Sequence, residues 1–260
     1  MHTRPITESA LVETVAAIDD HGARVQGMFT DIARGYDRAN RWMSLGIDVR
    51  WRRKAVAGAL PDRQAVAAGV RPRILDLCAG TLDSTLELHR KFPAADIVGG
   101  DFSAGMLAVG EAKLRGAARE RITPRQMDAH HLPEADASFD AVFCAFGVRN
   151  VSDLEAASRE QLRVLRPGGR LTVLEFFRPR GAFSRAFHAC YNNTVLPVVG
   201  WAATGNLGAY LYLPRSIGRF AAAADYCALL ERVGFARVRY ERLFGGVAGI
   251  VRAERPEEAR

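Results

Sequence analysis

Short, nearly continuous apolar runs recur along this chain, separated by segments with one polar and one apolar face. The first run, residues 74–78, reads Ile-Leu-Asp-Leu-Cys and ends at Ala79-Gly80. A run of this length is typical of a strand covered on both faces, as in a parallel sheet. The pattern predicts strands at residues 74–78, 96–100, 122–127, 139–146, 170–176, 236–243 and 247–253.

Helical patterns, with apolar positions three and four residues apart, alternate with these strands. Ser152 and Glu155 have the spacing of a capping box, in which each side chain satisfies a free amide of the first helical turn. Pro167-Gly168-Gly169 is expected to end that helix. Helices are predicted at residues 11–19, 25–36, 49–60, 83–91, 106–114, 152–165 and 216–233.

The order of these elements predicts the fold. Strands joined through helices run parallel with right-handed crossovers. Gly234 is expected to end the last helix in a left-handed turn, and Gly245-Gly246 predicts a hairpin. We therefore expect a single α/β domain with a doubly wound, mostly parallel, seven-stranded sheet. Its expected parts are a helical N-terminal extension (1–70), a core (71–179), an apolar cap of short helices (180–213) and a C-terminal helix and hairpin (214–260).

Composition narrows the class of protein without choosing a function. The chain has 260 residues, a net charge of +7 and a hydrophobic fraction of 48%, as expected for a soluble protein. Its basic residues form no block with interleaved aromatics, so no nucleic-acid partner is expected. The four cysteines lie far apart, which excludes a CxxC metal site and indicates buried thiols in a reducing compartment. No secretory signal or membrane-spanning window is recognised, so we expect a cytoplasmic protein.

Two loops of the predicted sheet carry candidate binding residues. Ligands of open α/β sheets bind beyond the carboxyl ends of the strands, where Gly80 and Asp101 stand. Gly80 lets a ligand approach the backbone because no Cβ intervenes. A carboxylate at Asp101 can accept hydrogen bonds from both ribose hydroxyls of an adenosine, in NAD or in S-adenosylmethionine. A structural turn followed by a helix cap would use the same residue types, so these two residues leave the alternatives open.

A longer series of motifs is more specific. The segments DLCAGT, GGDFSAGML, MDAHHLP, SFDAV and LRVLRPGGRL begin at Asp76, Gly99, Met127, Ser138 and Leu162. Together they resemble the class I methyltransferases. The resemblance implies a Rossmann-like fold and S-adenosylmethionine as cofactor. A nicotinamide-dependent dehydrogenase is not expected to carry this series.

Further segments resemble one branch, the C-methyltransferases of menaquinone and ubiquinone biosynthesis. These segments are 28–33, 36–40, 43–47, 51–52, 146–151, 174–176, 212–217 and 245–247. The resemblance implies methyl transfer to a ring carbon of a prenylated quinol, with demethylmenaquinol as the simplest substrate and the ubiquinone-pathway benzoquinol as an alternative. The same scaffold accepts many substrates, so methylation of another small aromatic compound is a further alternative. The last alternative is a subunit that binds the cofactor but has no catalytic turnover.

The resemblance also implies which residues bind the cofactor. Asp128 is expected to accept a hydrogen bond from the adenine amino group, and Ala129 to offer its backbone amide to the ring. No metal site is expected. The complete set of expected cofactor-binding residues is Asp76, Cys78, Ala79, Gly80, Thr81, Asp101, Phe102, Met106, Asp128, Ala129 and Phe146.

Ring methylation requires a quinol hydroxyl to lose its proton. The resemblance points to Arg149 for this work, with Asn150 and Tyr36 nearby. Because the pKa of arginine lies above about 12, Arg149 is expected to stabilise the phenolate while ordered water carries the proton. A surface ion pair is the structural alternative for Arg149. The neighbouring His130-His131 is a candidate base, but an exposed polar loop is the favoured interpretation of this pair.

Two residues depart from the family pattern. Leu82 stands where the related enzymes usually have glycine in the first loop. Either its φ is negative and its side chain turns away from the cofactor, or the affinity for the cofactor is reduced. Asp48 stands where the family often has histidine, so a substrate role does not carry over to this position.

The nearly insoluble substrate predicts an apolar surface and a nearby membrane. The cap is expected to form the mouth of a tunnel for the prenyl tail, with simple core packing as an equal alternative. The net positive charge would assist transient docking at the anionic inner face of the cytoplasmic membrane. The sequence leaves the oligomeric state open, and a homodimer is one alternative because dimers are common in the resembled family. The candidate tunnel residues are Phe183, Phe187, Tyr191, Leu196, Val199, Trp201, Tyr210 and Leu211.

Overall fold

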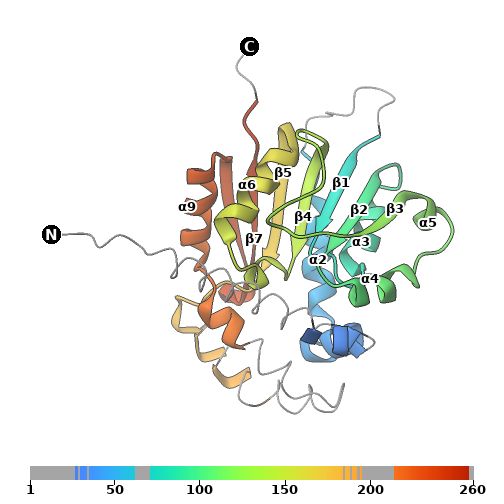
Figure 1. The fold of residues 1–260 in the computed structure, drawn as a ribbon. Coiled ribbons are helices and arrows are strands. Elements are labelled where there is room, and N and C mark those ends of the chain that lie inside the picture. The colour runs from blue at the N-terminus through green and yellow to red at the C-terminus, as the bar shows by residue number, and fades with distance from the viewer. Residues whose placement is uncertain are drawn as a thin grey trace, which may run out of the picture.

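A central sheet with helices on both faces dominates the computed structural model (Figure 1). The structure describes residues 27–28, 30–33, 35–61, 71–183, 185–187, 189–191, 194 and 214–257. The predicted helix at 11–19 and most of the predicted cap at 180–213 lie outside the described residues.

Seven strands form the sheet in the order β3-β2-β1-β4-β5-β7-β6. The first five along the chain run parallel, and β7 is antiparallel to both β5 and β6. This arrangement confirms the predicted doubly wound α/β fold. The strands are β1 (Arg73–Leu77), β2 (Asp96–Asp101), β3 (Ile122–Gln126), β4 (Phe139–Ala145), β5 (Leu165–Glu175), β6 (Ala236–Leu243) and β7 (Ala248–Glu254).

The strand order reverses at β1, which lies between β2 and β4. Asp76 of β1 pairs with Gly99 of β2 on one side and with Phe143 of β4 on the other. The carboxyl ends of the three strands therefore meet at one edge. Loops that leave neighbouring parallel strands toward opposite faces open a crevice at such a point.

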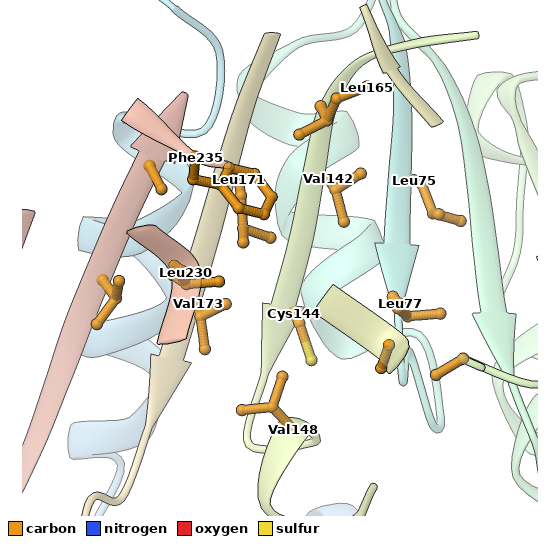
Figure 2. Close-up of a cluster of buried hydrophobic side chains, with 14 of the residues drawn as sticks. Leu75, Leu77, Val142, Cys144, Val148, Leu165, Leu171, Val173, Leu230 and Phe235 are labelled. Carbon is orange, nitrogen blue, oxygen red and sulfur yellow. The ribbon is translucent and has the colours of Figure 1, made fainter. Parts of the chain in front are cut away.

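Helices cover the two faces of the sheet and bury separate apolar clusters. On one face, α6 and α9 enclose a cluster in which Val142, Leu171 and Leu230 are fully buried (Figure 2). On the other, α2 and α3 contribute Ala55 and Leu88. Alternate strand residues point to opposite faces, so strands buried on both sides produce the continuous apolar runs of the sequence. The helices are α2 (Ile47–Ala57), α3 (Asp83–Lys91), α4 (Ala104–Glu111), α5 (Ala117–Arg121), α6 (Leu154–Val164) and α9 (Ala223–Val233).

The start of α6 differs from the predicted capping box. Asp153 is the N-cap, and its Oδ1 accepts a hydrogen bond from the amide of Ala156 at 2.9 Å. Ser152 lies one residue outside the helix, where its hydroxyl contacts Nε2 of His130 at 3.2 Å. Serine and aspartate are comparable N-caps. The prediction was wrong by one position because His130 holds Ser152 outside the helix.

The predicted helix at 216–233 is interrupted. The chain is helical at 214–219 and again in α9, and Ala221 lies between the two helices. The carbonyl oxygen of Ala221 accepts a hydrogen bond from the amide of Arg178 at 3.1 Å, while Phe220 is buried in the core. These contacts between distant segments divide a stretch for which the local sequence pattern predicts one continuous helix.

Pro167-Gly168-Gly169 forms a bulge inside β5 instead of a turn before it. The strand begins at Leu165, and its register against β4 shifts beyond Phe139. Gly168 has φ +76°, and its amide donates to the carbonyl of Arg255 at 3.0 Å. The C-terminal segment therefore pairs with residues that were expected to be a loop.

Two glycine predictions are confirmed. Gly234 ends α9 with φ +116° in the left-handed region. Gly245 and Gly246, at φ +65° and +96°, join the antiparallel strands β6 and β7. Glycine adopts such angles without the steric cost that a Cβ brings.

The four cysteines are free thiols in different surroundings. Cys144 is buried, Cys78 and Cys227 are half-buried, and Cys190 is exposed. The prediction of buried thiols is therefore right for Cys144 and wrong for Cys190.

Candidate active site

A cavity opens at the carboxyl ends of β1, β2 and β4, where the strand order reverses. The described residues that line it are Tyr36, Asp37, Arg52, Cys78, Ala79, Gly80, Thr81, Asp83, Asp101, Met106, Ala145, Phe146, Gly147 and Asn150.

Most of the predicted site residues lie in this wall. Of the cofactor-binding and catalytic sets, the structure brings together Tyr36, Cys78, Ala79, Gly80, Thr81, Asp101, Met106, Phe146 and Asn150. The described wall does not include Asp76, Phe102, Asp128, Ala129 or Arg149. It does include Asp37, Arg52 and Asp83, to which the sequence analysis assigned no role. The roles of all these residues stay predictions.

The glycine turn after β1 is held by the end of β2. The amide of Gly80 donates to Oδ2 of Asp101 at 2.8 Å, and the amide of Ser103 donates to Oδ1 at 2.8 Å. A carboxylate has about four acceptor sites, so each oxygen keeps capacity toward the cavity. Burial raises the pKa of Asp101, although these backbone hydrogen bonds oppose the shift. Gly80 has φ +55°, and a Cβ there would lie 3.2 Å from Cε of Met106.

For Leu82 the prediction of a negative φ is wrong, whereas the side chain does turn away from the cavity. Its φ is +63°, in the left-handed region, yet its side chain is fully buried away from the cavity wall. Added Cβ atoms at Gly99 and Gly110 would lie 2.7 Å and 2.5 Å from the Leu82 side chain. The two glycines therefore make room for the leucine between β2 and α4. The turn keeps the left-handed conformation that glycine would give, and the aliphatic group joins the core.

Substitutions at Leu82 should separate backbone strain from packing. We expect Leu82→Ala to lower the free energy of unfolding by about 2–4 kcal/mol, because it leaves a cavity in the core. Leu82→Gly should be about 1 kcal/mol less destabilising than alanine, because a left-handed residue with a Cβ costs about 1–2 kcal/mol. Urea unfolding of the two variants measures both quantities. Equal stability of the two would mean that the turn carries no strain at this position.

Asp76 is a buried carboxylate beside the turn. Its Oδ2 accepts a hydrogen bond from the hydroxyl of Thr85 at 2.5 Å, while its buried Oδ1 has no hydrogen-bond partner among the described residues. Burial raises the pKa of Asp76 to about 7, although the Thr85 hydrogen bond and the positive charge of Arg52 oppose the shift. An unsatisfied buried acceptor costs free energy, so this oxygen is suited to a cationic or donor group.

The raised pKa of Asp76 should give stability a pH dependence. The unfolded chain releases this proton near the ordinary pKa of 3.8, whereas the folded chain keeps it up to about pH 7. Stability from this group is therefore present at low pH and is lost as the pH rises through that window. We expect the wild type to lose about 1.4 kcal/mol per pH unit relative to Asp76→Asn between about pH 4.5 and 6.5. Urea unfolding of both proteins across this range checks the slope. Parallel curves would mean that Asp76 is already ionised in the folded protein.

His130 has a structural role in the loop after β3. Oδ1 of Asp128 accepts hydrogen bonds from the backbone amide and the ring Nδ1 of His130, at 2.9 Å and 2.6 Å. Nε2 of the same ring accepts from the amide of Asp153 at 3.1 Å. Burial alone would raise the pKa of Asp128, but these hydrogen bonds with His130 lower it below its ordinary value. Both ring nitrogens are engaged, and His131 is exposed, so neither histidine is arranged as a base for the cavity.

Lys113 links the N-terminal helical residues to the glycine turn. Nζ of Lys113 donates to the carbonyl of Thr81 at 2.8 Å and to Asp83 at 2.9 Å, and it also contacts Asp37. Arg41 donates to Asp83 at 2.8 Å. The extension thereby forms one wall of the cavity, next to the turn.

Asp48 belongs to the same network. It accepts hydrogen bonds from Ser44 at 2.6 Å and from Arg41 at 3.1 Å, and Nε of Arg52 lies 3.7 Å from it. The guanidinium of Arg52 lies over the Phe146 ring, 5.2 Å from its centroid. Asp48 is therefore a buried partner that holds Arg52 in the cavity wall.

Arg149 is buried, which contradicts the alternative of a surface ion pair. Its Nη1 donates to Oε1 of Glu175 at 2.8 Å and to the carbonyl of Phe146 at 2.5 Å, and its Nε donates to Ser216 at 3.3 Å. The side chains of Arg149 and Glu175 are 5% and 0% exposed. Burial raises the pKa of Glu175, and the charge of Arg149 opposes that shift. This pair fixes the loop that carries Asn150 into the cavity.

A comparison with protein families decides the class of this chain. Residues 17–255 match the ubiE/COQ5 methyltransferase family. The chain belongs to this family. It is therefore a methyltransferase, and the predicted enzyme class is confirmed.

Curated relatives match most of the chain. The methyltransferase is 45% identical over 230 residues to the demethylmenaquinone methyltransferase of Thermus thermophilus, which covers 88% of this chain and 100% of that protein. It is 39% identical over 244 residues to the ubiquinone/menaquinone biosynthesis C-methyltransferase UbiE of Geobacter sulfurreducens, with 93% and 92% covered.

Solved structures share the fold at low sequence identity. The [4+2]-cyclase SpnF has a TM-score of 0.65 at 19% identity, with 91% of this chain and 97% of that chain covered. Phosphoethanolamine N-methyltransferase 2 of Haemonchus contortus has a TM-score of 0.58 at 15% identity, with 79% and 52% covered. At these identities the likeness concerns the fold, and it confirms the Rossmann-like architecture.

Proposed function

We propose that this methyltransferase transfers the methyl group of S-adenosylmethionine to a ring carbon of a prenylated quinol, most simply demethylmenaquinol. One observation carries the proposal: the cavity at the strand reversal presents Asp101 and the Gly80 turn, in a chain that resembles a demethylmenaquinone methyltransferase over 88% of its length. The naming of the Geobacter relative supports a benzoquinol as the second candidate substrate.

The residues beside β1 and β2 fit the cofactor. A Cβ at Gly80 would press on Met106, so the glycine keeps open the space that a ligand would use. Asp101 would accept the two ribose hydroxyls with its remaining lone pairs. S-adenosylmethionine, when bound, supplies a methyl group activated by its sulfonium charge. The chain needs chiefly to hold donor and acceptor in line.

The acceptor carbon becomes nucleophilic when a neighbouring hydroxyl of the quinol loses its proton. A fixed positive charge in the cavity favours that phenolate. Arg52 lines the cavity while it pairs with Asp48 at 3.7 Å, whereas Arg149 lies outside the described wall and donates to buried Glu175 at 2.8 Å. We therefore assign phenolate stabilisation to Arg52, with Arg149 holding the loop of Asn150. Tyr36 and Asn150 would orient the ring from opposite segments of the wall.

An assay with purified protein tests the proposal. The protein, S-adenosylmethionine and a short-chain demethylmenaquinol under reducing conditions should yield the ring-methylated product by mass spectrometry. The oxidised quinone should yield none, because it has no phenolic proton to lose. His131→Ala, a change at an exposed loop residue, is a control that should keep full turnover. A deletion strain that still makes methylated quinones would point to another aromatic substrate.

Contact with anionic lipid is part of the proposal. No helix among the described residues is long and apolar enough to cross a membrane. Aromatic rings gather at the surface instead: Phe187 lies 6.5 Å from Phe183, 5.6 Å from Tyr191 and 5.5 Å from Phe244, between centroids. Phe183 and Phe244 are 59% and 51% exposed. Sedimentation with vesicles should show binding that increases with the fraction of anionic lipid, and equal binding to neutral vesicles would contradict it.

A further inference from the structure

Two thiols lie at the carboxyl ends of neighbouring strands. Cys144 is in β4, and Cys78 is the first residue after β1. Asp76 pairs with Phe143, so Cys78 follows the ladder one residue beyond Cys144. Neighbouring strands are about 4.8 Å apart, and the Cα atoms of bridged cysteines are usually about 4.4–6.8 Å apart. The backbone therefore permits a bond between the two sulfurs.

The side chains point toward each other. A Cβ added to Gly147 would lie 2.9 Å from Sγ of Cys78 and 3.1 Å from Sγ of Cys144, so both sulfurs adjoin one point. A hydrogen bond with Cys78, together with burial, raises the pKa of the Cys144 thiol well above its ordinary value. Cys144 lies on the same face of the sheet as Leu77, in the buried cluster against which Cys78 packs (Figure 2).

The two thiols differ in access. Cys78 lines the cavity, whereas Cys144 is fully buried. A small oxidant that enters the cavity reaches Cys78 first, and Cys144 is positioned to react with the product. An accessible thiol beside a second, resolving thiol is the arrangement of reversible redox sites.

We propose that Cys78 and Cys144 form a reversible disulfide that distorts the wall of the cofactor cavity under oxidation by a peroxide. The Cys78 thiol gives up its proton, and the resulting thiolate attacks one peroxide oxygen. The O–O bond breaks, a sulfenic acid forms, and the leaving hydroxide takes up a proton to become one water. The Cys144 thiol then displaces the hydroxyl from that sulfur, and a second water leaves. Two thiols are oxidised to one disulfide, and one hydrogen peroxide is reduced to two waters.

The disulfide would change the shape of the cavity wall, because the bond between the two sulfurs is short. A disulfide requires about 2.05 Å between sulfurs, so the hydrogen-bonded thiols must move closer. Cys78 directly precedes the turn of Ala79 and Gly80, and the backbone of Gly147 packs on its Cβ. All four residues lie in the cavity wall or adjoin it. The disulfide itself needs no substrate, whereas its effect on S-adenosylmethionine binding rests on the proposed function.

Peptide mapping tests the bond directly. The reduced full-length protein is treated with hydrogen peroxide, free thiols are alkylated, and the peptides are analysed by mass spectrometry. We expect a Cys78–Cys144 cross-link that dithiothreitol removes. In Cys144→Ala, dimedone should instead label a persistent sulfenic acid at Cys78. Cys227→Ala, a change at a half-buried cysteine on α9, should behave as wild type. Oxidation of exposed Cys190 without a Cys78–Cys144 cross-link would overturn the proposal.

Calorimetric titration with S-adenosylmethionine tests the consequence. Reduced wild type and reduced Cys144→Ala should bind equally, and the oxidised wild type should bind on the order of tenfold or more weakly, as expected for a wall distorted by a strained bridge. Cross-linked protein that binds as tightly as the reduced form would overturn control of the cavity. Failure of the reduced protein to bind would instead contradict the proposed function, and it would leave the peptide result unaffected.

Discussion

Replacing Asp101 with alanine should weaken the binding of S-adenosylmethionine by about 100-fold or more. The carboxylate already holds the amides of Gly80 and Ser103 at 2.8 Å each, so it both shapes the turn and presents its remaining lone pairs to the cavity. Hydrogen bonds to a charged group contribute about 1.5–3 kcal/mol each. Loss of two of them, at about 1.4 kcal/mol per tenfold change, gives the expected size.

Calorimetric titration measures this loss, and the opposite end of the same strand offers the control. Asp96 begins β2, is 46% exposed and pairs with Arg121 at 3.0 Å. Asp96→Ala should therefore bind S-adenosylmethionine as the wild type does. Circular dichroism establishes that both variants are folded. A folded Asp101→Ala protein with unchanged affinity would show that the cofactor does not use the end of β2.

Replacing Arg149 with methionine should lower the free energy of unfolding by about 3–5 kcal/mol, because removing one partner of a buried ion pair leaves the other charge uncompensated. Glu175 is fully buried and would lose the guanidinium that opposes the rise of its pKa. The double variant Arg149→Met/Glu175→Gln removes both charges, so it should recover most of the lost stability.

Urea unfolding measures the free energy of unfolding of the wild type, of Arg149→Met and of the double variant. Arg180→Met is the matched control. Arg180 pairs with Asp225 at 2.8 Å on the surface, where such pairs contribute about 0–1 kcal/mol. A small effect of Arg149→Met, similar to that of the control, would contradict the role of the buried pair. Turnover of the double variant then separates the two assignments. Recovered stability with recovered activity supports a positioning role, whereas recovered stability without activity restores Arg149 as the phenolate partner.

The sheet was predictable because a strand buried on both faces appears in the sequence as a short continuous apolar run. Each central strand had to be a short apolar run, and the glycine at position 234 had to adopt a positive φ where a helix ends. The positions of two candidate binding residues were predictable from the strand order. Gly80 and Asp101 stand at neighbouring strand ends, which parallel topology brings together.

Features that depend on distant segments were not predictable. The interrupted helix near Phe220 requires the backbone of Arg178, and the cap at Asp153 requires His130. The cavity wall similarly needs Arg52 to be held by the network around Asp48. Local spacing contains no signal for these contacts. The Trp-Arg pair at 51–52, quoted as part of the family resemblance, was the available hint for Arg52.

The packing of Leu82 limits which substitutions are tolerated at Gly99 and Gly110. Near Gly99, the tightest contact of an added methyl group is the Leu82 side chain at 2.7 Å, and the next is 3.4 Å away. Gly110 is also blocked by the backbone carbonyl carbon of Thr81 at 2.8 Å. Alanine at 99 is thus harmful beside leucine but becomes admissible once glycine occupies 82, while 110 stays restricted in either background. We therefore expect replacements at positions 82 and 99 to be interdependent, with alanine at 99 tolerated only after glycine has replaced Leu82.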